Sequence, residues 1–138
     1  MESVTRIGAS IDRRLLARFD KLARRLGFSN RSRALSHLLR EKLIEEEVEG
    51  RGEVVGTVTL VYNHHASDVL ARLARLQHHS HSSVVSSTHV HLDQENCLEI
   101  IILRGFASEV RKLGERMIST RGVKSGRQVL TTTGKSIP

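Results

Sequence analysis

Residues 88–103 read THVHLDQENCLEIIIL, and this stretch decides how the second half of the chain folds. Side chains i and i+2 of a strand point the same way, so His89 and His91 project side by side. The short polar run 93–96 is typical of a turn, and it returns the chain so that Cys97 comes alongside. The stretch therefore predicts a β-hairpin that presents two imidazoles and one thiol on one face.

Two imidazoles and a thiolate suit a borderline-soft transition metal such as Zn, Ni, Cu or Co. One further ligand would complete a four-coordinate site, and His78, His79 and His81 lie just upstream. The alternative is an exposed strand with incidental histidines, but an H-x-H motif beside the only cysteine favours metal binding. His64 and His65, at the end of an earlier predicted strand, are candidates for a secondary metal site.

The composition of the 138-residue chain predicts small aliphatic cores, since it has no Trp, one Tyr and three Phe. Such cores are often completed by oligomerisation. The single cysteine cannot form an internal disulfide, and it fits a reducing compartment. No apolar run approaches the ~20 residues that span a bilayer, and no signal peptide is recognisable, so we expect a soluble cytoplasmic protein without a membrane partner.

The net charge of +7 lies entirely in the first third of the chain. Residues 1–44 hold 11 of the 22 Lys and Arg but 4 of the 15 Asp and Glu, which gives +7; residues 45–138 hold 11 of each sign. This asymmetry indicates a basic module that binds a polyanion, joined to a neutral module with a different function. A solvated basic face without a partner is the alternative.

The basic module reads as one strand and two helices. Residues 6–11 alternate as a strand does, and Asp12 can cap a helix that Gly27 ends. Ser29 or Asn30 then opens a second helix. Because so short a unit buries little apolar surface, we expect it to form an intertwined dimer.

The rest of the chain alternates strands and helices in a recognisable order. Residues 45–47 and 50–52 indicate a linker, so we predict domains at 1–48 and 53–138 joined by 49–52. Ser67 or Asp68 should cap the first helix of the second domain, and Gly105 should break its third strand. The order strand-helix-strand-strand-helix-strand is the ferredoxin-like plan. The predicted strands are 53–62, 84–92, 97–104 and 123–132. One predicted helix carries apolar residues from Val69 to Leu76 and ends at the histidine cluster, and the other carries apolar residues from Val110 to Ile118 and ends at Arg121-Gly122.

Nearly the whole chain resembles the nickel-responsive transcriptional regulators (NikR). The matching motifs are Gly27–Ser32 (GFSNRS), Gln77-His78-His79, His89-Val90-His91 and Cys97-Leu98-Glu99-Ile100. The resemblance implies an α+β protein with an N-terminal ribbon-helix-helix (βαα) DNA-binding domain and a C-terminal ACT-like (βαββαβ) domain. It also implies a regulator, not an enzyme, that is activated by nickel to bind operator DNA and repress nickel-uptake genes.

The resemblance implies a square-planar Ni(II) site, with one Ni(2+) per subunit. His89, His91 and Cys97 of one subunit and His78 of a neighbour would hold the ion. The protein would be a homotetramer, built as a dimer of dimers.

Four further residues are expected to support these sites. Glu99 lies two residues beyond Cys97 on the same face, where it can accept a ring N–H from a ligand histidine, and Tyr62 is a candidate for the same role. Both are equally reasonable as core-edge residues. Family members bind a cation with acidic side chains where this chain has Arg33 and His37, so we expect the Arg33 guanidinium to replace a potassium ion.

The resemblance also implies how DNA is bound. Two copies of the strand 6–11 would pair and enter the major groove, while the start of the second helix would meet a phosphate. The groove-facing residues would be Arg6, Gly8 and Ser10, and the phosphate-facing residues would be Asn30, Arg31 and Ser32.

Other functions fit parts of the sequence. The regulator could respond to Cu, Co or Zn, or to a small molecule in the ACT-like domain, because the ligand types alone do not rank these metals. A Cys-His enzyme with Cys97 as nucleophile and His89 or His91 as base is a further alternative. The basic N-terminal module and the lack of an evident oxyanion-hole loop argue against that enzyme.

Overall fold

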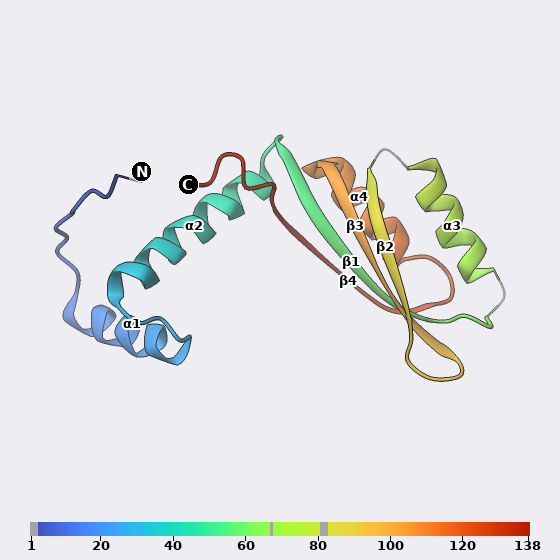
Figure 1. The fold of residues 1–138 in the computed structure, drawn as a ribbon, viewed down its shortest axis with the longest axis horizontal. Coiled ribbons are helices and arrows are strands. Elements are labelled where there is room, and N and C mark those ends of the chain that lie inside the picture. Colours follow the sequence, from blue (N-terminus) through green and yellow to red (C-terminus); the bar gives the residue numbers. More distant parts are fainter. Residues whose placement is uncertain (1–2, 67, 81–82) are drawn as a thin grey trace. The chain divides into compact units, whose positions relative to one another are not determined.

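A computed structural model describes residues 3–66, 68–80 and 83–138 (Figure 1). The chain divides into two compact units, with the boundary between Glu41 and Lys42. Each unit is described by itself. No helix in the described ranges is both long enough and apolar enough to cross a membrane.

The first unit contains helix α1 and the N-terminal part of helix α2, and both helices begin at a predicted cap. Helix α1 spans Arg13–Arg25, and the Asp12 side chain accepts a hydrogen bond from the Leu15 N–H at 2.9 Å. Gly27 adopts a left-handed φ of +87° after the helix, as its C-terminal position predicts. Asn30 caps helix α2, Arg31–Glu49, by accepting from the Arg33 N–H at 2.9 Å. The predicted caps at Asp12 and Asn30 are confirmed.

The predicted strand 6–11 has no strand partner within one chain, and residues 3–12 form neither helix nor strand. The backbone N–H and C=O groups of an isolated strand have no neighbouring strand to hydrogen-bond with, so strand formation here would need a second chain. The first unit buries only Ala23 and Ala34 among its described residues. Many of its large apolar side chains are exposed, among them Ile7, Ile11, Leu15, Leu22, Leu26, Leu38 and Leu39.

The predicted linker at residues 45–47 is wrong, because α2 continues to Glu49. Lys42 and Glu45, three residues apart on this helix, form an ion pair at 2.8 Å. Val48, in the last turn of this helix, packs against the core of the second unit, to which residues 42–49 belong. The change of direction comes at 50–52, directly before the first strand.

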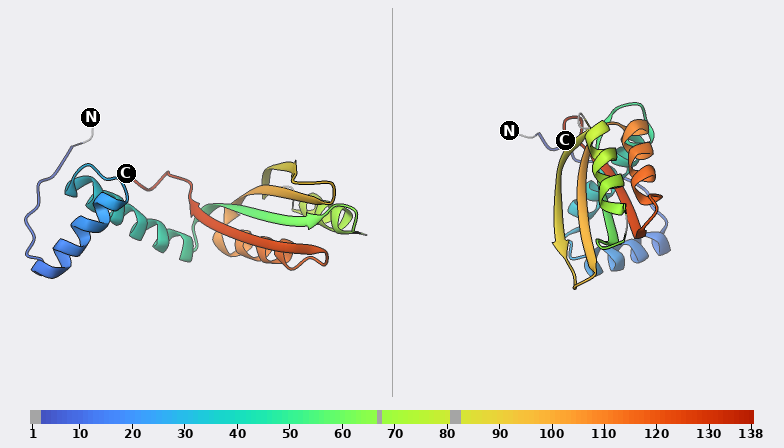
Figure 2. Two further views of the ribbon diagram at one scale, coloured as in Figure 1. Left: turned by 90° about the horizontal axis from the view of Figure 1, so that it is seen from below. Right: turned by 90° about the vertical axis from the view of Figure 1, so that its right-hand side faces the viewer.

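The second unit is a four-stranded antiparallel sheet with both helices on one face (Figure 2). The strand order is β2-β3-β1-β4, and the chain order βαββαβ is the predicted ferredoxin-like plan. The elements are β1 (Glu53–Asn63), α3 (Val69–His79), β2 (Val84–His91), β3 (Asn96–Phe106), α4 (Ala107–Ile118) and β4 (Val123–Thr132). The fold class α+β is therefore confirmed for this unit.

The core lies between the sheet and its two helices. Alternate residues of β1 and β3 point into it, as the period of two requires. Each fully buried aliphatic side chain contributes roughly 1.5–3 kcal/mol relative to exposure. The fully buried members are Val54, Val58, Leu60, Tyr62, Val69, Leu73, Cys97, Ile101, Leu103, Val110 and Met117.

Two local predictions for this unit are wrong. Strand β3 does not break at Gly105 but continues to Phe106, because Gly105 still pairs with Val54 of β1. Asp68 does not cap α3 with its side chain; it has a left-handed φ of +72°, and its carbonyl accepts from the Arg72 N–H instead. The alternative cap, Ser67, lies outside the described residues.

Gly122 joins α4 to β4 at a point of close approach. Its φ is +101°, and a Cβ placed there would lie 2.9 Å from the Val69 Cβ on α3. The turn after α4 is thereby pressed against the start of α3.

We predict that Gly122→Ala lowers the free energy of unfolding by about 1–3 kcal/mol, because a left-handed alanine is strained and the contact is too short. Urea denaturation followed by circular dichroism, at fixed protein concentration, measures the change. Gly52→Ala is the matched control, since Gly52 has open space around it, and it should shift stability by less than about 0.5 kcal/mol. Equal stability of the two variants would contradict this account of the turn.

Candidate metal centre

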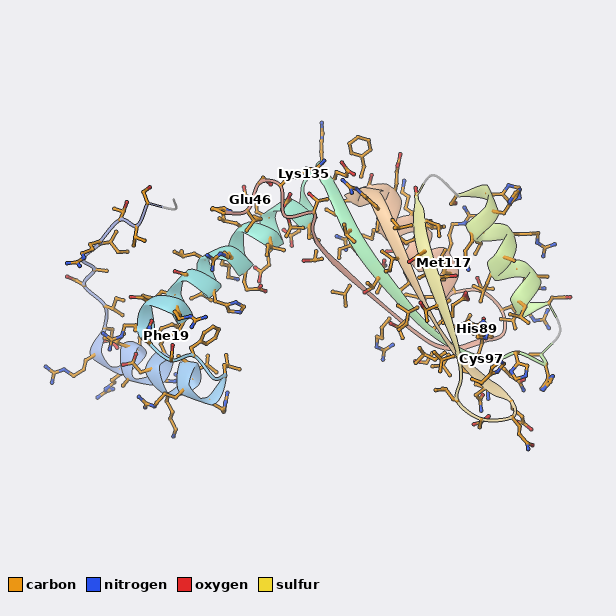
Figure 3. All side chains as sticks on the ribbon, in the orientation of Figure 1. Phe19, Glu46, His89, Cys97, Met117 and Lys135 are labelled. Atoms are coloured by element: carbon orange, nitrogen blue, oxygen red, sulfur yellow. The ribbon has the colours of Figure 1, made fainter. Side chains whose placement is uncertain are left out.

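The register of β3 with both neighbouring strands gathers the predicted ligands at one end of the sheet. Cys97 lies opposite Tyr62 of β1 and opposite His91 of β2, while Glu99 lies opposite His89. Directly opposed residues of antiparallel strands share a face, so these side chains all lie on the helix-covered side. Figure 3 shows His89 and Cys97 near one another at the end that carries the β2–β3 hairpin.

One group of three metal-binding side chains forms among the described residues: His64, His91 and Cys97. Their ligand atoms lie within 4.8 Å of one another. The Cys97 Sγ is 3.0 Å from the Nδ1 of His64 and 3.3 Å from the Nδ1 of His91. A thiol and two imidazoles at this spacing need only a small adjustment to converge on one transition-metal ion.

The electrostatic environment keeps two of these ligands neutral in the metal-free protein. Burial, with the nearby Asp93 and Glu99 carboxylates, raises the pKa of the Cys97 thiol. Burial and the neighbouring imidazoles lower the pKa of His64. A neutral imidazole offers its lone pair to a metal, and a divalent cation replaces the thiol proton. The residues present therefore fit a metal ion, which would supply the positive charge that a buried thiolate needs.

The hairpin turn that brings Cys97 back is fixed by Asp93. One carboxylate oxygen of Asp93 accepts from the backbone N–H groups of Glu95 and Asn96 at 2.8 and 2.7 Å. The Asn96 side-chain amide donates to both carboxylate oxygens at 3.2 and 3.0 Å. The Asn96 side chain, followed by the backbone donors, lowers the pKa of Asp93 to about 2. The predicted turn at 93–96 is thus confirmed, with a carboxylate at its centre.

A buried polar cluster lies beneath the ligands. Glu99 is buried and accepts hydrogen bonds from the Tyr62 hydroxyl at 3.2 Å and from the Gln77 amide at 3.3 Å. Burial, followed by the Glu99 charge, raises the pKa of Tyr62. The His89 ring meets the Tyr62 ring edge-on, with their centroids 5.9 Å apart. The hydrogen bond between Glu99 and Gln77 thus joins β3 to α3, and Gln77 is the residue directly before His78.

Comparisons with known proteins identify the family of this chain. Residues 55–131 match the model of the NikR C-terminal nickel-binding domain. The chain belongs to the nickel-responsive regulator family. This is a family of regulators, not of enzymes, so Cys97 is not the nucleophile of a Cys-His enzyme.

The similar proteins span essentially the whole chain. The chain is 48% identical to a candidate nickel-responsive regulator of Geobacter metallireducens over 99% of both proteins. It is 44% identical to one of Pyrococcus furiosus, covering 97% of this chain and 98% of that protein. The fold is also similar to that of an uncharacterized protein of Thermotoga maritima, with a TM-score of 0.51 and 12% identity over 57% of this chain and 98% of that one.

Two predicted ligands of this regulator lie outside the group of three. His89 is exposed on β2, with its ring centroid 5.5 Å from that of His91. His78 is exposed on α3, where its ring faces that of His79 at 5.9 Å. The assignment of His89 as a ligand in the same subunit as Cys97, and of His78 as a ligand from a neighbouring subunit, stays a prediction. His81 lies outside the described residues.

His64 was predicted only for a secondary site, yet it lies against the thiol. It follows β1 directly, and β1 pairs with β3 up to Asn63 opposite Asn96, next to Cys97. The His64 N–H donates to the Glu95 carbonyl at 3.1 Å, and His65 donates from Nε2 to the Gln94 carbonyl at 3.1 Å. The hairpin turn and the end of β1 are thus fastened together. The adjacent imidazoles at 64–65 were the available signal in the sequence.

The predicted DNA-binding residues are all exposed. Arg6, Gly8 and Ser10 lie in the irregular segment before α1. Ser32 lies in the first turn of α2, beside the Asn30 cap.

Three other predicted residues of α2 have local partners. Arg31 makes a bidentate ion pair with Asp20, at 3.0 Å from Nε and 2.7 Å from Nη2. The hydrogen-bonded pair lowers the pKa of Asp20 and raises that of Arg31. The His37 ring lies 5.1 Å from that of Phe28, and the Arg33 N–H is engaged by the helix cap. The sequence analysis missed the Arg31–Asp20 pair, which orients Arg31 in one chain.

The low pKa of Asp93 predicts an acid dependence of stability. A carboxylate with a depressed pKa stabilises the fold at any pH above its ordinary value of 3.8, and this contribution is lost as the pH falls toward 2. We predict that Asp93→Asn is less stable than the parent protein at pH 6 and that the difference shrinks below pH ~4. Thermal melts from pH 2 to 6 test this, with Gln94→Ala as the control. A stability difference that does not depend on pH would refute the role of the charge.

Proposed function

We propose that this member of the family is a nickel-dependent DNA-binding regulator that represses nickel-uptake genes. The observation that carries the proposal is the buried Cys97 thiol held within 3.3 Å of two imidazoles, inside a domain that matches the nickel-binding family model. Thiolate and imidazole donors suit Ni(II). The net positive charge of the first unit favours binding to DNA.

The proposed centre is a four-coordinate Ni(II), one per subunit. His89, His91 and Cys97 of one subunit would supply three donors, and His78 of a neighbouring subunit the fourth. His64 already lies 3.0 Å from the thiol, so it competes for the fourth position within its own chain. A site completed by His78 of a neighbouring subunit and a site completed by His64 of the same chain make different predictions for single-residue variants.

Oligomerisation to a homotetramer, a dimer of dimers, is part of the proposal. The sheet face away from the helices leaves apolar side chains exposed, including Val90, Ile100 and Val129. The first unit exposes a further set of leucines and buries little. Such apolar surfaces are typical of protein interfaces, and pairing of the first units would also give residues 6–11 a strand partner.

The proposed DNA surface is built from two parts of the first unit. Arg6, Gly8 and Ser10 would face the major groove when two copies of residues 6–11 pair. The start of α2, with Asn30, Arg31 and Ser32, would place backbone N–H groups near a phosphate. The Arg31 guanidinium would then bind that phosphate, either in place of Asp20 or together with it.

Nickel regulates DNA binding only if it binds the DNA-competent state more tightly than the other state. A hundredfold preference corresponds to about 2.7 kcal/mol of coupling. The Gln77–Glu99 hydrogen bond offers a physical link, because it joins the helix that carries His78 to the strand that carries Cys97. Ordering that helix on metal binding would favour one arrangement of subunits.

The ligand set can be tested by anaerobic nickel titration of the full-length protein, read by the thiolate-to-nickel absorption band. We predict one equivalent of nickel per chain and loss of the band in Cys97→Ala. We also predict more than about 100-fold weaker binding in His78→Ala and His89→Ala, since even the loss of a residue that hydrogen-bonds to a ligand costs 10–100-fold. His37→Ala removes a histidine from the first unit and is the matched control.

The variants also separate the two sets. Weakened binding in His64→Ala with unchanged binding in His78→Ala would replace the cross-subunit ligand by His64. An unaltered nickel response in Cys97→Ala would refute the centre altogether.

Arg6 provides the test of DNA recognition. We predict that Arg6→Ala weakens nickel-dependent binding to duplexes selected from a random library by about 1–3 kcal/mol, the value of a bidentate base contact, and leaves nickel affinity unchanged. Fluorescence anisotropy at fixed salt measures the change. Arg51→Ala removes the same charge near the end of α2 and should have a much smaller effect. Equal losses in both variants would indicate a general charge effect and not base recognition.

A further inference from the structure

A shallow, open hollow of about 460 Å³ is lined by residues of α3, of α4 and of the turn that follows α4. Figure 2 shows these two helices next to one another on the same face of the sheet. The residues that line the hollow come from both helices and from the turn after α4. They are Arg72, Arg75, Leu76, His79, Arg116, Ser119, Thr120 and Arg121.

The helical spacing explains why so many cations meet there. Arg72, Arg75 and His79 are three and four residues apart, so they share one face of α3. Arg116 faces them from α4. Arg121 follows in the turn that Gly122 presses against Val69, and this close approach brings the fourth guanidinium to the same hollow.

The hollow is strongly positive, because four guanidiniums and no carboxylate line it. None of the ion pairs found among residues 3–66, 68–80 and 83–138 involves these four arginines. Other arginines of the chain do pair, such as Arg104 with Glu53 at 2.6 Å. Like charges gathered around one hollow repel, and an anion would relieve that repulsion.

We propose that this hollow is a binding site for a small anion that carries phosphate groups. Guanidinium groups match phosphate oxygens through paired N–H donors, and charge-assisted bonds of this kind are the strong ones. The hydroxyls of Ser119 and Thr120 already donate to the Arg116 carbonyl at 3.3 and 2.8 Å, so the arginines supply the donors for the anion. Four guanidinium groups around one shallow hollow suit a compact, multiply charged ligand, whereas a duplex presents its phosphates in extended rows.

This site is distinct from the metal ligands and does not depend on the nickel proposal. An anion bound to arginines of both helices would hold α3 against α4. Because α3 also carries Gln77 and His78, the anion would bind the same helix that holds the proposed cross-subunit ligand.

Isothermal titration calorimetry of the full-length, metal-free protein with pyrophosphate at fixed ionic strength tests the site. We expect saturable binding with one site per chain. The double substitution Arg75→Gln and Arg116→Gln should weaken it by at least about 100-fold, at about tenfold for each lost charge-assisted contact. The matched control is the double substitution Arg51→Gln and Lys112→Gln, which removes the same charge from exposed positions outside the hollow and should change binding less than about twofold.

Circular dichroism melts verify that each variant folds; if the double variant does not, the single substitutions carry the test, each with a loss of about tenfold. Absence of saturable pyrophosphate binding overturns the proposal. Equal weakening in the control variant also overturns it, because bulk charge would then explain the binding. If Arg75 and Arg116 matter for random-sequence duplex DNA but not for pyrophosphate, the hollow is part of a nucleic-acid surface and the proposal is wrong.

Discussion

The pairing of β3 with β1 on one side and β2 on the other is the constraint on which the candidate centre depends. It sets Cys97 opposite both Tyr62 and His91. Because side chains alternate with a period of two, a one-residue slip of β3 would move Cys97 and Glu99 to the open face of the sheet. The aliphatic residues that follow, Ile101 and Leu103, are fully buried on the same face. Hydrophobic burial along the strand therefore fixes the position of the thiol at its end.

The same strand carries Glu99, the one buried carboxylate among the described residues, and its hydrogen-bond partners explain how the fold tolerates it. An unpaired buried charge would cost several kcal/mol, but Glu99 accepts from Tyr62 and Gln77, which come from a different strand and a helix. Each partner is thereby fixed in one orientation, and Tyr62 in turn meets the His89 ring. The polar cluster couples the positions of β1, β3 and α3. Stability and ligand placement thus rest on the same three hydrogen-bonding side chains.

Local patterns in the sequence predicted the hairpin, the alternating strands and the helix caps at Asp12 and Asn30, because these depend on neighbours within a few residues. Several of the features that the sequence did not predict depend on long-range contacts. Val48, in the last turn of α2, packs on a core built from strands and helices far along the chain, and His64 lies against Cys97 through the pairing of β1 with β3. The Arg31–Asp20 pair joins two helices. No spacing rule within one segment predicts such contacts.

Both units of a single chain leave apolar side chains exposed, and in the proposed regulator this would link metal binding to DNA binding. The first unit exposes most of its leucines, and the sheet exposes Val90 and Ile100 on the face without helices. Apolar area of this kind favours association of chains, at roughly 25 cal/mol per Å² removed from water. Association would supply a partner for residues 6–11 and a neighbour for the exposed ring of His89. Metal binding and DNA binding would then both be properties of the same assembly, so an ion that changes how chains associate would also change how strongly they hold DNA.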